Sequence, residues 1–350
     1  MSEANERLGI GIIGLGHRWR TRHLPALRSL ADRFSVRAVF DAVYQLAVNA
    51  SEELGAEPVG GIQPLVERED VDAILVLGTQ WHGFYPLVAS RRVEKPLYYG
   101  GPLGILGRCK QEIGDEIADY PEFMAELPRR WAPGTIRLKE LIATTLGRPK
   151  LLFCHQRRGA EDEPVENNGG EPEPGRELIE MIDWCCYVVG EDPRSVIGVR
   201  HGAASPTSRD SETNDDFDYQ ALTLDFSARQ APGSETIAQI SFGRYFPSSW
   251  EEAIHYRPLA DMQIACERGV AFVDLPSKLV WFDSFGRHQE SLDSERPVGE
   301  QLLIRFHQSI LHGEHRFSDW LEIRRALEVL CGAAKSHAEG RRRELPLGDC

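Results

Sequence analysis

The stretch Gly9-Ile-Gly-Ile-Ile-Gly14-Leu-Gly16 decides the fold of this 350-residue chain. Its apolar residues, Leu8–Leu15, predict a buried strand, and a helix is predicted over His23–Leu30. Gly14 and Gly16 let the backbone turn tightly between the two and approach a pyrophosphate, which would rest on amide groups at the start of the helix. The stretch therefore predicts the first strand, turn and helix of a dinucleotide-binding sheet; an ordinary strand–turn–helix with glycines in its turn would have the same pattern.

A carboxylate follows at the end of the next predicted strand. The apolar run Val36–Phe40 ends on Asp41. A carboxylate there can accept hydrogen bonds from an adenosine ribose and would repel a 2′-phosphate. The sequence thus predicts NAD as the cofactor, in preference to NADP.

The glycine loop departs from the usual pattern in one place and has a basic edge. Trp19 stands where a third glycine or alanine is expected, so the indole must turn aside or occupy space beside the phosphates. His17, Arg18, Arg20 and Arg22 surround it; they could hold an anion or form the solvated start of a helix. We include His17 and Arg18 among the expected cofactor-binding residues.

Short apolar runs alternate with helical patterns through residues 1–131. Further strands are predicted at Ala73–Leu77, Pro96–Tyr99 and Glu122–Leu127, and further helices at Leu46–Leu54, Phe84–Ser90 and Lys110–Tyr120. This alternation is typical of βαβ units and predicts an α/β fold whose N-terminal domain is a Rossmann-type, doubly wound parallel sheet.

In residues 132–350 the order of predicted elements differs, because several strands follow one another without helices between them. Strands are predicted at Lys150–His155, Ala221–Phe226, Ile237–Phe242, Met262–Glu267, Val270–Asp274 and Lys278–Asp283, and helices at Gly134–Thr144, Glu177–Val189, Gly299–Leu311 and Asp319–Ala338. An acidic loop without periodicity, Ala160–Gly175, is expected to be solvated. The pattern predicts a second α/β domain with a large, mostly antiparallel open sheet and a terminal helix over residues 319–338.

The composition excludes several classes of protein. A net charge of −14 opposes binding to nucleic acid or to an anionic membrane surface, so neither is an expected partner. The seven cysteines are odd in number and never spaced Cys-x-x-Cys, so we expect no disulfide framework and no metal site. No run approaches the ~20 apolar residues that a membrane helix needs. A cytoplasmic protein is expected.

With these segments placed, the chain resembles the glucose–fructose oxidoreductase/inositol 2-dehydrogenase (Gfo/Idh/MocA) family almost from end to end. The resemblance depends on the glycine loop with His23-Leu-Pro-Ala-Leu27, on Asp41, on Asp70-Val-Asp-Ala-Ile-Leu-Val-Leu77 and above all on Pro128-Arg-Arg-Trp-Ala-Pro133. It implies a Rossmann domain and an open-sheet domain, NAD(P)-dependent oxidation of a sugar or polyol, and assembly into a homodimer or homotetramer through the open sheet.

The resemblance also shows which catalytic groups differ. Relatives carry Glu-Lys-Pro after the fifth strand, and counting from Thr79 places Gly100-Gly101-Pro102 there. We therefore interpret Gly101 as standing in the lysine's place and Lys95, within Glu94-Lys95-Pro96, as a charge at the edge of a strand. The family's Thr-Pro-Asn is replaced by Thr79-Gln80-Trp81, so Thr79 and Trp81 are the expected neighbours of a nicotinamide, together with Gly101.

The family's helix motif, Asp-x-Gly-x-His-x-x-Asp, retains only its last residue, Asp183, and Glu180 stands where its histidine would be. Hydride transfer to or from a carbinol needs a group that takes or gives the hydroxyl proton. Glu180 with Asp183 on the same helix face is one candidate catalytic set, and His82, just after the fourth strand, is another. Alternatively, Glu180 pairs with Arg176, four residues earlier, and His82 is a solvated loop residue.

Two functions therefore remain open. The first is a nicotinamide-dependent oxidoreductase of altered acid–base chemistry that acts on a small sugar-like or polyol substrate. The second is a non-catalytic relative that binds a ligand or serves in assembly.

Overall fold

The computed structural model describes residues 7–78, 82–104, 106, 122–159, 175–202, 218–228, 233, 235–246, 249, 252, 260–312 and 317–347. These residues form two compact units. The first contains the chain up to Pro128 together with Pro297–Arg324, and the second contains Arg129–Pro164, Pro174–Arg296 and the chain from Arg325 onward. The chain therefore returns to the first unit near its end.

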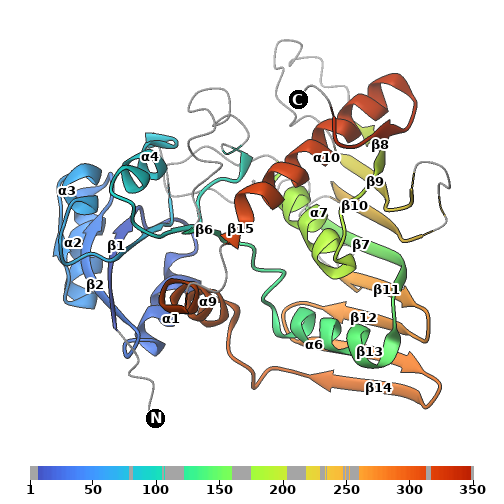
Figure 1. Cartoon of the computed structure of the whole chain (residues 1–350), viewed down its shortest axis with the longest axis horizontal. Coiled ribbons are helices and arrows are strands. Elements are labelled where there is room, and N and C mark those ends of the chain that lie inside the picture. Colours follow the sequence, from blue (N-terminus) through green and yellow to red (C-terminus); the bar gives the residue numbers. More distant parts are fainter. Residues whose placement is uncertain are drawn as a thin grey trace. The chain divides into compact units, whose positions relative to one another are not determined.

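The first unit is built on a parallel sheet (Figure 1). Among the described residues this sheet has seven strands in the order β15-β6-β5-β4-β1-β2-β3, and every neighbouring pair is parallel. The strands are β1 (Leu8–Ile13), β2 (Phe34–Phe40), β3 (Glu57–Pro58), β4 (Ala73–Val76), β5 (Leu97–Tyr99), β6 (Glu122–Ala125) and β15 (Phe317–Ser318). The order reverses between β1 and β4, which is where open sheets of this kind bind ligands.

Helices complete the first unit because buried parallel strands need cover on both faces. They are the π-helix η1 (Trp19–His23) and the α-helices α1 (Leu24–Ser29), α2 (Tyr44–Leu54), α3 (Ile62–Val66), α4 (Tyr85–Arg92) and α9 (Val298–His312). Helix α1 packs against α9, and α3 packs against α4. All residues of β1, β4 and β5 are buried, so the core of the unit lies along the central strands.

The second unit is built on a sheet of nine described strands, in the order β14-β13-β12-β11-β7-β10-β9-β8-β16. Only the pair β7 and β10 is parallel among them. The strands are β7 (Pro149–Gly159), β8 (Ser195–His201), β9 (Tyr219–Asp225), β10 (Ile237–Phe246), β11 (Met262–Cys266), β12 (Val270–Asp274), β13 (Lys278–Asp283), β14 (Gly286–Ser291) and β16 (Arg343–Glu344).

One face of this sheet is covered by helices, as Figure 1 shows for α6, α7 and α10. These helices are α6 (Pro133–Leu141), which continues into the π-helix η4 (Ile142–Leu146), α7 (Arg176–Val189) and α10 (Asp319–Glu339). The covered face carries buried residues such as Leu152, Ile240 and Val273. The opposite face carries exposed apolar side chains, among them Leu151, Val199 and Phe282.

The predicted fold class is confirmed: a doubly wound parallel sheet is joined to an α/β unit with a large, mostly antiparallel open sheet. The terminal helix extends over Asp319–Glu339. Cys331 on this helix is disulfide-bonded, whereas Cys154, Cys185, Cys186 and Cys266 are free thiols. Within the described part of the chain, no helix is long and apolar enough to cross a membrane.

Candidate functional site

The glycine loop after β1 crosses the segment that follows β4 at very close range. Gly14 and Gly16 have φ angles of +68° and +65°, in the left-handed region that side chains disfavour. A Cβ atom at Gly14 would overlap the carbonyl oxygen of Gly78, and one at Gly16 would overlap that of Leu77. Both glycines are therefore required by the crossing of the two loops, in addition to any contact with a pyrophosphate.

Asp41 joins the end of β2 to the glycine loop. Its carboxylate accepts hydrogen bonds from the backbone N–H of Leu15 at 3.0 Å and from that of Val43 at 2.8 Å. Asp41 is buried, and it lines a pocket at this edge of the sheet. A carboxylate oxygen has more than one lone pair, so Asp41 can still accept a bond from a ligand hydroxyl.

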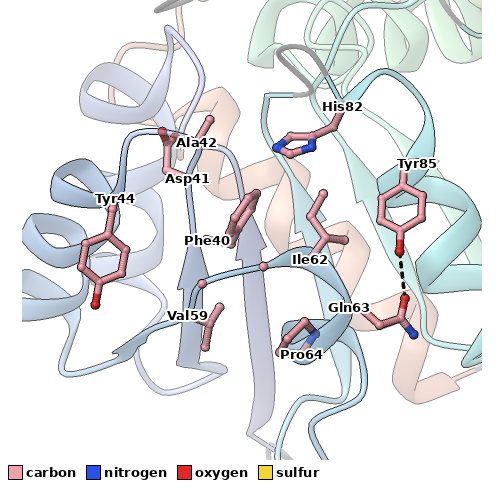
Figure 2. Close-up of a pocket in the computed structure, with 12 residues that line it drawn as sticks. Phe40, Asp41, Ala42, Tyr44, Val59, Ile62, Gln63, Pro64, His82 and Tyr85 are labelled. Carbon is pink, nitrogen blue, oxygen red and sulfur yellow. Dashed lines mark hydrogen bonds between the residues drawn. The ribbon is translucent and has the colours of Figure 1, made fainter.

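The pocket has a volume of about 650 Å³. Figure 2 shows Asp41 and Tyr44 on one side of it and His82 and Tyr85 on the other. Its lining residues come from the segments that follow β2 and β3, from the starts of α2, α3 and α4 and from the segment before α4: Phe40, Asp41, Ala42, Tyr44, Val59, Gly60, Gly61, Ile62, Gln63, Pro64, His82 and Tyr85. The pocket is apolar with a few polar groups, as small-molecule sites commonly are.

An adenosine fits the chemistry of this pocket. Apolar side chains such as Phe40, Val59 and Ile62 would face a base, while Asp41 would face a ribose hydroxyl. Gly60 lines the pocket, and a Cβ atom there would meet no atom within 4 Å, so a side chain at this position would be accommodated without a clash. Tyr85 closes the far side by donating a hydrogen bond to Gln63 Oε1 at 3.1 Å.

His82 belongs to the lining of this pocket. Its ring lies against Phe40, with a centroid separation of 5.3 Å and an interplanar angle of 59°. Burial lowers the pKa of His82, while the charge of Asp41 opposes that shift. The imidazole is therefore favoured in its neutral form, and it lines the same pocket as Asp41 from the opposite side. Its predicted part in proton transfer stays a prediction.

A buried carboxylate, Glu126, lies at the same edge of the sheet and was not among the predicted site residues. Glu126 follows the last residue of β6, and its side chain is 1% exposed. His23 Nε2 lies 2.8 Å from Glu126 Oε2, Arg22 forms a short ion pair with Oε1, and Arg18 Nη1 lies 3.6 Å from Oε1. A Cβ atom at Gly100 would lie 2.6 Å from Glu126 Oε2, so the carboxylate fills the space that a side chain at position 100 would need.

These neighbours determine the charge of Glu126. Burial alone would raise the pKa of the carboxyl, but the charges of His23, Arg22 and Arg18 and the His23 hydrogen bond lower it well below its usual value. Glu126 is therefore ionised at neutral pH. The only sequence signal for it is an acidic residue that follows the apolar run Phe123–Ala125 of the predicted strand.

The basic residues of the glycine loop lie in two different environments. Arg18 donates a hydrogen bond to His17 Nε2 at 3.0 Å and approaches Glu126. Arg20 points elsewhere: it is exposed and pairs with Glu53 at 2.9 Å. Trp19 is buried, at the first position of the π-helix η1. The indole has thus turned into the protein interior.

Lys95 and Gly101 lie at opposite ends of β5. Lys95 precedes the strand, and its ammonium donates hydrogen bonds to the carbonyls of Val66 and Arg68 at 2.7 and 2.6 Å. Lys95 thus satisfies carbonyls at the C-terminal end of α3, in keeping with its interpretation as a strand-edge charge. Gly101 follows β5 at the carboxyl edge, two positions after Tyr99. Thr79 and Trp81 lie outside the described residues.

Glu180 and Asp183 lie on the buried face of α7, in the second unit, and both are paired with arginines. Arg176 Nε lies 2.9 Å from Glu180 Oε1, and Arg129 Nε lies 3.8 Å from Oε2. Asp183 makes a two-pronged ion pair with Arg130, of which the Nε bond is 2.7 Å long. Arg130 belongs to the segment on which the family resemblance is strongest, so this pair fixes that segment to α7.

No protein-family model and no curated protein sequence matches the chain. Solved structures do resemble it in fold. A levoglucosan dehydrogenase in complex with NADH and levoglucosan is 14% identical, with a TM-score of 0.78 over 98% of this chain and 100% of that one. An NAD-binding oxidoreductase from Klebsiella pneumoniae is 16% identical, with a TM-score of 0.74 over 98% and 100%. An aldose–aldose oxidoreductase from Caulobacter crescentus, complexed with glycerol, is 13% identical, with a TM-score of 0.73 over 97% and 100%.

Proposed function

We propose that this chain is a member of the Gfo/Idh/MocA family and an NAD-dependent oxidoreductase that acts on a sugar-like or polyol substrate. The observation that carries the proposal is the position of Asp41, whose carboxylate binds the glycine loop and also lines the pocket beside it. The fold shared with oxidoreductases that act on sugars supports the same assignment. The protein is proposed to be cytoplasmic.

The cofactor would be held by Gly14, Gly16, His17 and Arg18 at its pyrophosphate and by Asp41 at its adenosine ribose. A 2′-phosphate on that ribose would meet the carboxylate of Asp41, which is the reason for proposing NAD over NADP. When bound, the nicotinamide supplies the hydride acceptor. Gly101 leaves the end of β5 without a side chain, and Thr79 and Trp81 are proposed neighbours of the ring.

The chain's own groups must then move the hydroxyl proton. Glu180 is the proposed acceptor because it is the carboxylate that stands in the histidine's place, and Asp183 positions it by fixing α7 to Arg130. Arg176 and Arg129 favour the ionised form of a carboxylate, which suits a base better than an acid. Glu180→Gln should therefore lower turnover at least about a hundredfold while leaving NAD affinity unchanged.

A second function is favoured by the same ion pairs. The pairing of Glu180 with Arg176 is also what a structural carboxylate would do, and in that case the chain is a non-catalytic relative that binds its ligand without turnover. One experiment distinguishes the two functions. Full dinucleotide binding with no oxidation of any sugar or polyol, in both the natural chain and Glu180→Gln, supports the non-catalytic relative.

The pocket itself is tested by filling it. Gly60 lines the pocket, so Gly60→Leu adds an isobutyl group at its wall, whereas Gly60→Ala adds a single methyl group and serves as the matched control. We expect Gly60→Leu to weaken NAD binding by at least about tenfold with little change in melting temperature, and Gly60→Ala to bind nearly as the natural chain does. Unchanged NAD affinity in Gly60→Leu would exclude this pocket as the adenosine site.

Assembly into a homodimer or homotetramer is part of the proposal. The uncovered face of the second sheet has exposed apolar side chains on separate strands, including Leu151 on β7, Val199 on β8 and Phe282 on β13. Exposed apolar side chains gathered on one face of an open sheet are typical of an interaction surface. A second copy of the same face is the proposed cover, because the strand register places these side chains on one face of the sheet.

A further inference from the structure

Two arginines on neighbouring strands of the second sheet approach the same carboxylate. Arg158 lies near the end of β7, and Arg244 lies near the end of the parallel strand β10. Arg158 Nη2 is 3.7 Å from Glu177 Oε1, and Arg244 Nη2 is 3.8 Å from Glu177 Oε2. Glu177 belongs to α7, which packs against both strands. The arginine pair, Arg158 and Arg244, therefore lies on the helix-covered face of the sheet.

The arginine pair has hydrogen-bond donors that its carboxylate does not satisfy. Both distances to Glu177 are longer than a hydrogen bond. The Nε atoms of Arg158 and Arg244 are buried, and within the described part of the chain they have no hydrogen-bond partner. A buried donor without an acceptor destabilises the fold, and like charges on neighbouring strands repel each other. The oxygen atoms of a bound anion would relieve both effects.

The charge of this cluster is positive and reaches solvent. Among the described residues, Glu177 is the one carboxylate within 4.0 Å of the arginine pair, so two positive charges face one negative charge. The side chains of Arg158 and Arg244 are 41% and 23% exposed, whereas that of Glu177 is 16% exposed. Arg244 Cζ also lies 5.5 Å from the centre of the Phe242 ring, which limits the positions of this guanidinium. A group held in this way loses little conformational entropy when it binds a ligand.

The arginine pair is close to Glu180, the proposed proton acceptor. Glu177 and Glu180 lie three residues apart on α7, so they share one helix face with about 5–6 Å between their Cβ atoms. Arg129 connects the same helix to β7: its Nη2 atom donates a hydrogen bond to Gln156 Oε1 at 2.7 Å, and its Nε atom lies 3.8 Å from Glu180 Oε2. Gln156 and Arg158 are two residues apart on β7 and therefore face the same side of the sheet. One sugar-sized molecule can thus reach both Glu180 and the arginine pair.

We propose that the arginine pair binds the carboxylate or phosphate group of an anionic sugar or polyol, whose hydroxyl group is then presented to Glu180. This assignment of the substrate class rests on the proposed function. A guanidinium recognises either oxyanion through paired hydrogen bonds, which a neutral sugar cannot accept with the same strength. Glu177 is a positioning residue: it holds the two guanidinium groups toward α7 and does not touch the anion.

The test is a calorimetric titration of the full-length protein with sodium gluconate, with glucose 6-phosphate and with neutral sorbitol, each without NAD and with saturating NAD. The variants are Arg158→Gln and Arg244→Gln. Their matched control is Arg148→Gln, which removes the same charge just before β7, where Arg148 is 77% exposed and pairs with Glu191 at 3.3 Å. We expect either variant of the arginine pair to weaken anion binding about tenfold or more and Arg148→Gln to leave it within about twofold. Arg244→Lys, which keeps the charge, should recover part of the affinity and replaces Arg244→Gln if that variant does not fold.

The preferred anion identifies the charged group of the substrate. Tighter binding of gluconate indicates a carboxylate, and tighter binding of glucose 6-phosphate indicates a phosphate, provided that the affinity depends on the arginine pair. The proposal is overturned if neither anion binds in either condition, if sorbitol binds as tightly as both anions, or if Arg148→Gln has the same effect as Arg244→Gln.

The same titrations keep this proposal apart from the proposed function. The anion can bind through the arginine pair when NAD does not bind or when no substrate is oxidised, in which case the oxidoreductase assignment fails alone. Conversely, NAD binding and oxidation of a neutral polyol without anion binding would overturn the anionic substrate and leave the oxidoreductase standing.

Discussion

Replacing Asp41 with alanine tests the link between the glycine loop and the pocket. The variant loses the ribose contact and also leaves two backbone N–H groups, those of Leu15 and Val43, without their acceptor. A hydrogen bond to a charged group contributes about 1.5–3 kcal/mol, which corresponds to about 10- to 150-fold in affinity. The two unpaired N–H groups cost about 1–3 kcal/mol each in stability if water does not replace the carboxylate.

The affinity for NAD should fall, whereas the affinity for NADP should not. NAD should bind about 10- to 150-fold more weakly to Asp41→Ala, whereas NADP is released from repulsion and should bind as well as before or better. Calorimetric titration of both dinucleotides measures this, with thermal unfolding recorded alongside. Asp72→Ala is the matched control, because Asp72 Oδ2 accepts a hydrogen bond from the backbone N–H of Gly9 at 2.7 Å, at the other end of β1.

The control separates loss of stability from loss of recognition. Asp72→Ala should lower the melting temperature while leaving the ratio of NAD to NADP affinity unchanged. Equal losses of NAD and NADP affinity in Asp41→Ala would refute the assignment of Asp41 to the ribose. An unchanged melting temperature in Asp41→Ala would refute its role in holding the loop.

Three further perturbations have defined outcomes. Asp183→Asn breaks a buried ion pair whose side chains are 2% and 8% exposed, and denaturant unfolding should show a loss of about 3–5 kcal/mol; a loss below about 1 kcal/mol would contradict the pair's structural role. Since the folded pKa of Glu126 lies below its ordinary value of 4.5, its ionised form stabilises the fold fully above that pH, and this contribution is lost as the pH falls further below it. The melting-temperature difference between the natural chain and Glu126→Gln should accordingly stay constant from pH 7 to pH 5 and shrink as the pH is lowered below 4.5, and a difference that stays constant down to pH 3 would contradict this. Val199→Lys should reduce the mass measured by light scattering, whereas Phe285→Lys, at the exposed turn between β13 and β14, should not; equal masses for both variants would exclude the open face as the interface.

The fold could be predicted because its signals are local. Val270–Asp274 and Lys278–Asp283 were predicted with the bounds that the structure has, since each alternates buried and outward residues and is followed by a turn. Strand β8 was missed, and Gly198 in its centre is one reason. A Cβ atom there would overlap the carbonyl oxygen of Ala333, so the strand needs a glycine for α10 to pack against it. That requirement is visible only in three dimensions.

The site could be predicted only in part. The glycines follow the first strand and Asp41 follows the second, and the ends of these two parallel strands are neighbours. The sequence alone therefore predicted that these residues lie close together. Glu126 could not be found in this way, because its partners His23 and Arg22 are 103 and 104 residues distant in the chain. The ion pair of Glu180 with Arg176 was an alternative at helical spacing, and it is present. His82 was a candidate proton carrier, and that role stays a prediction; its ring lies beside Phe40 in the lining of the pocket that Asp41 also lines.

The central claim is that the carboxyl edge of the first sheet binds a nicotinamide dinucleotide. The most direct measurement is calorimetric titration of the cofactor-stripped protein with NAD, NADH, NADP and NADPH, with melting temperatures recorded at the same concentrations. We predict micromolar binding with NAD preferred, and about 2.7 kcal/mol of added stability at 100 times the dissociation constant. Binding of none of the four dinucleotides to a well-folded sample would contradict the claim.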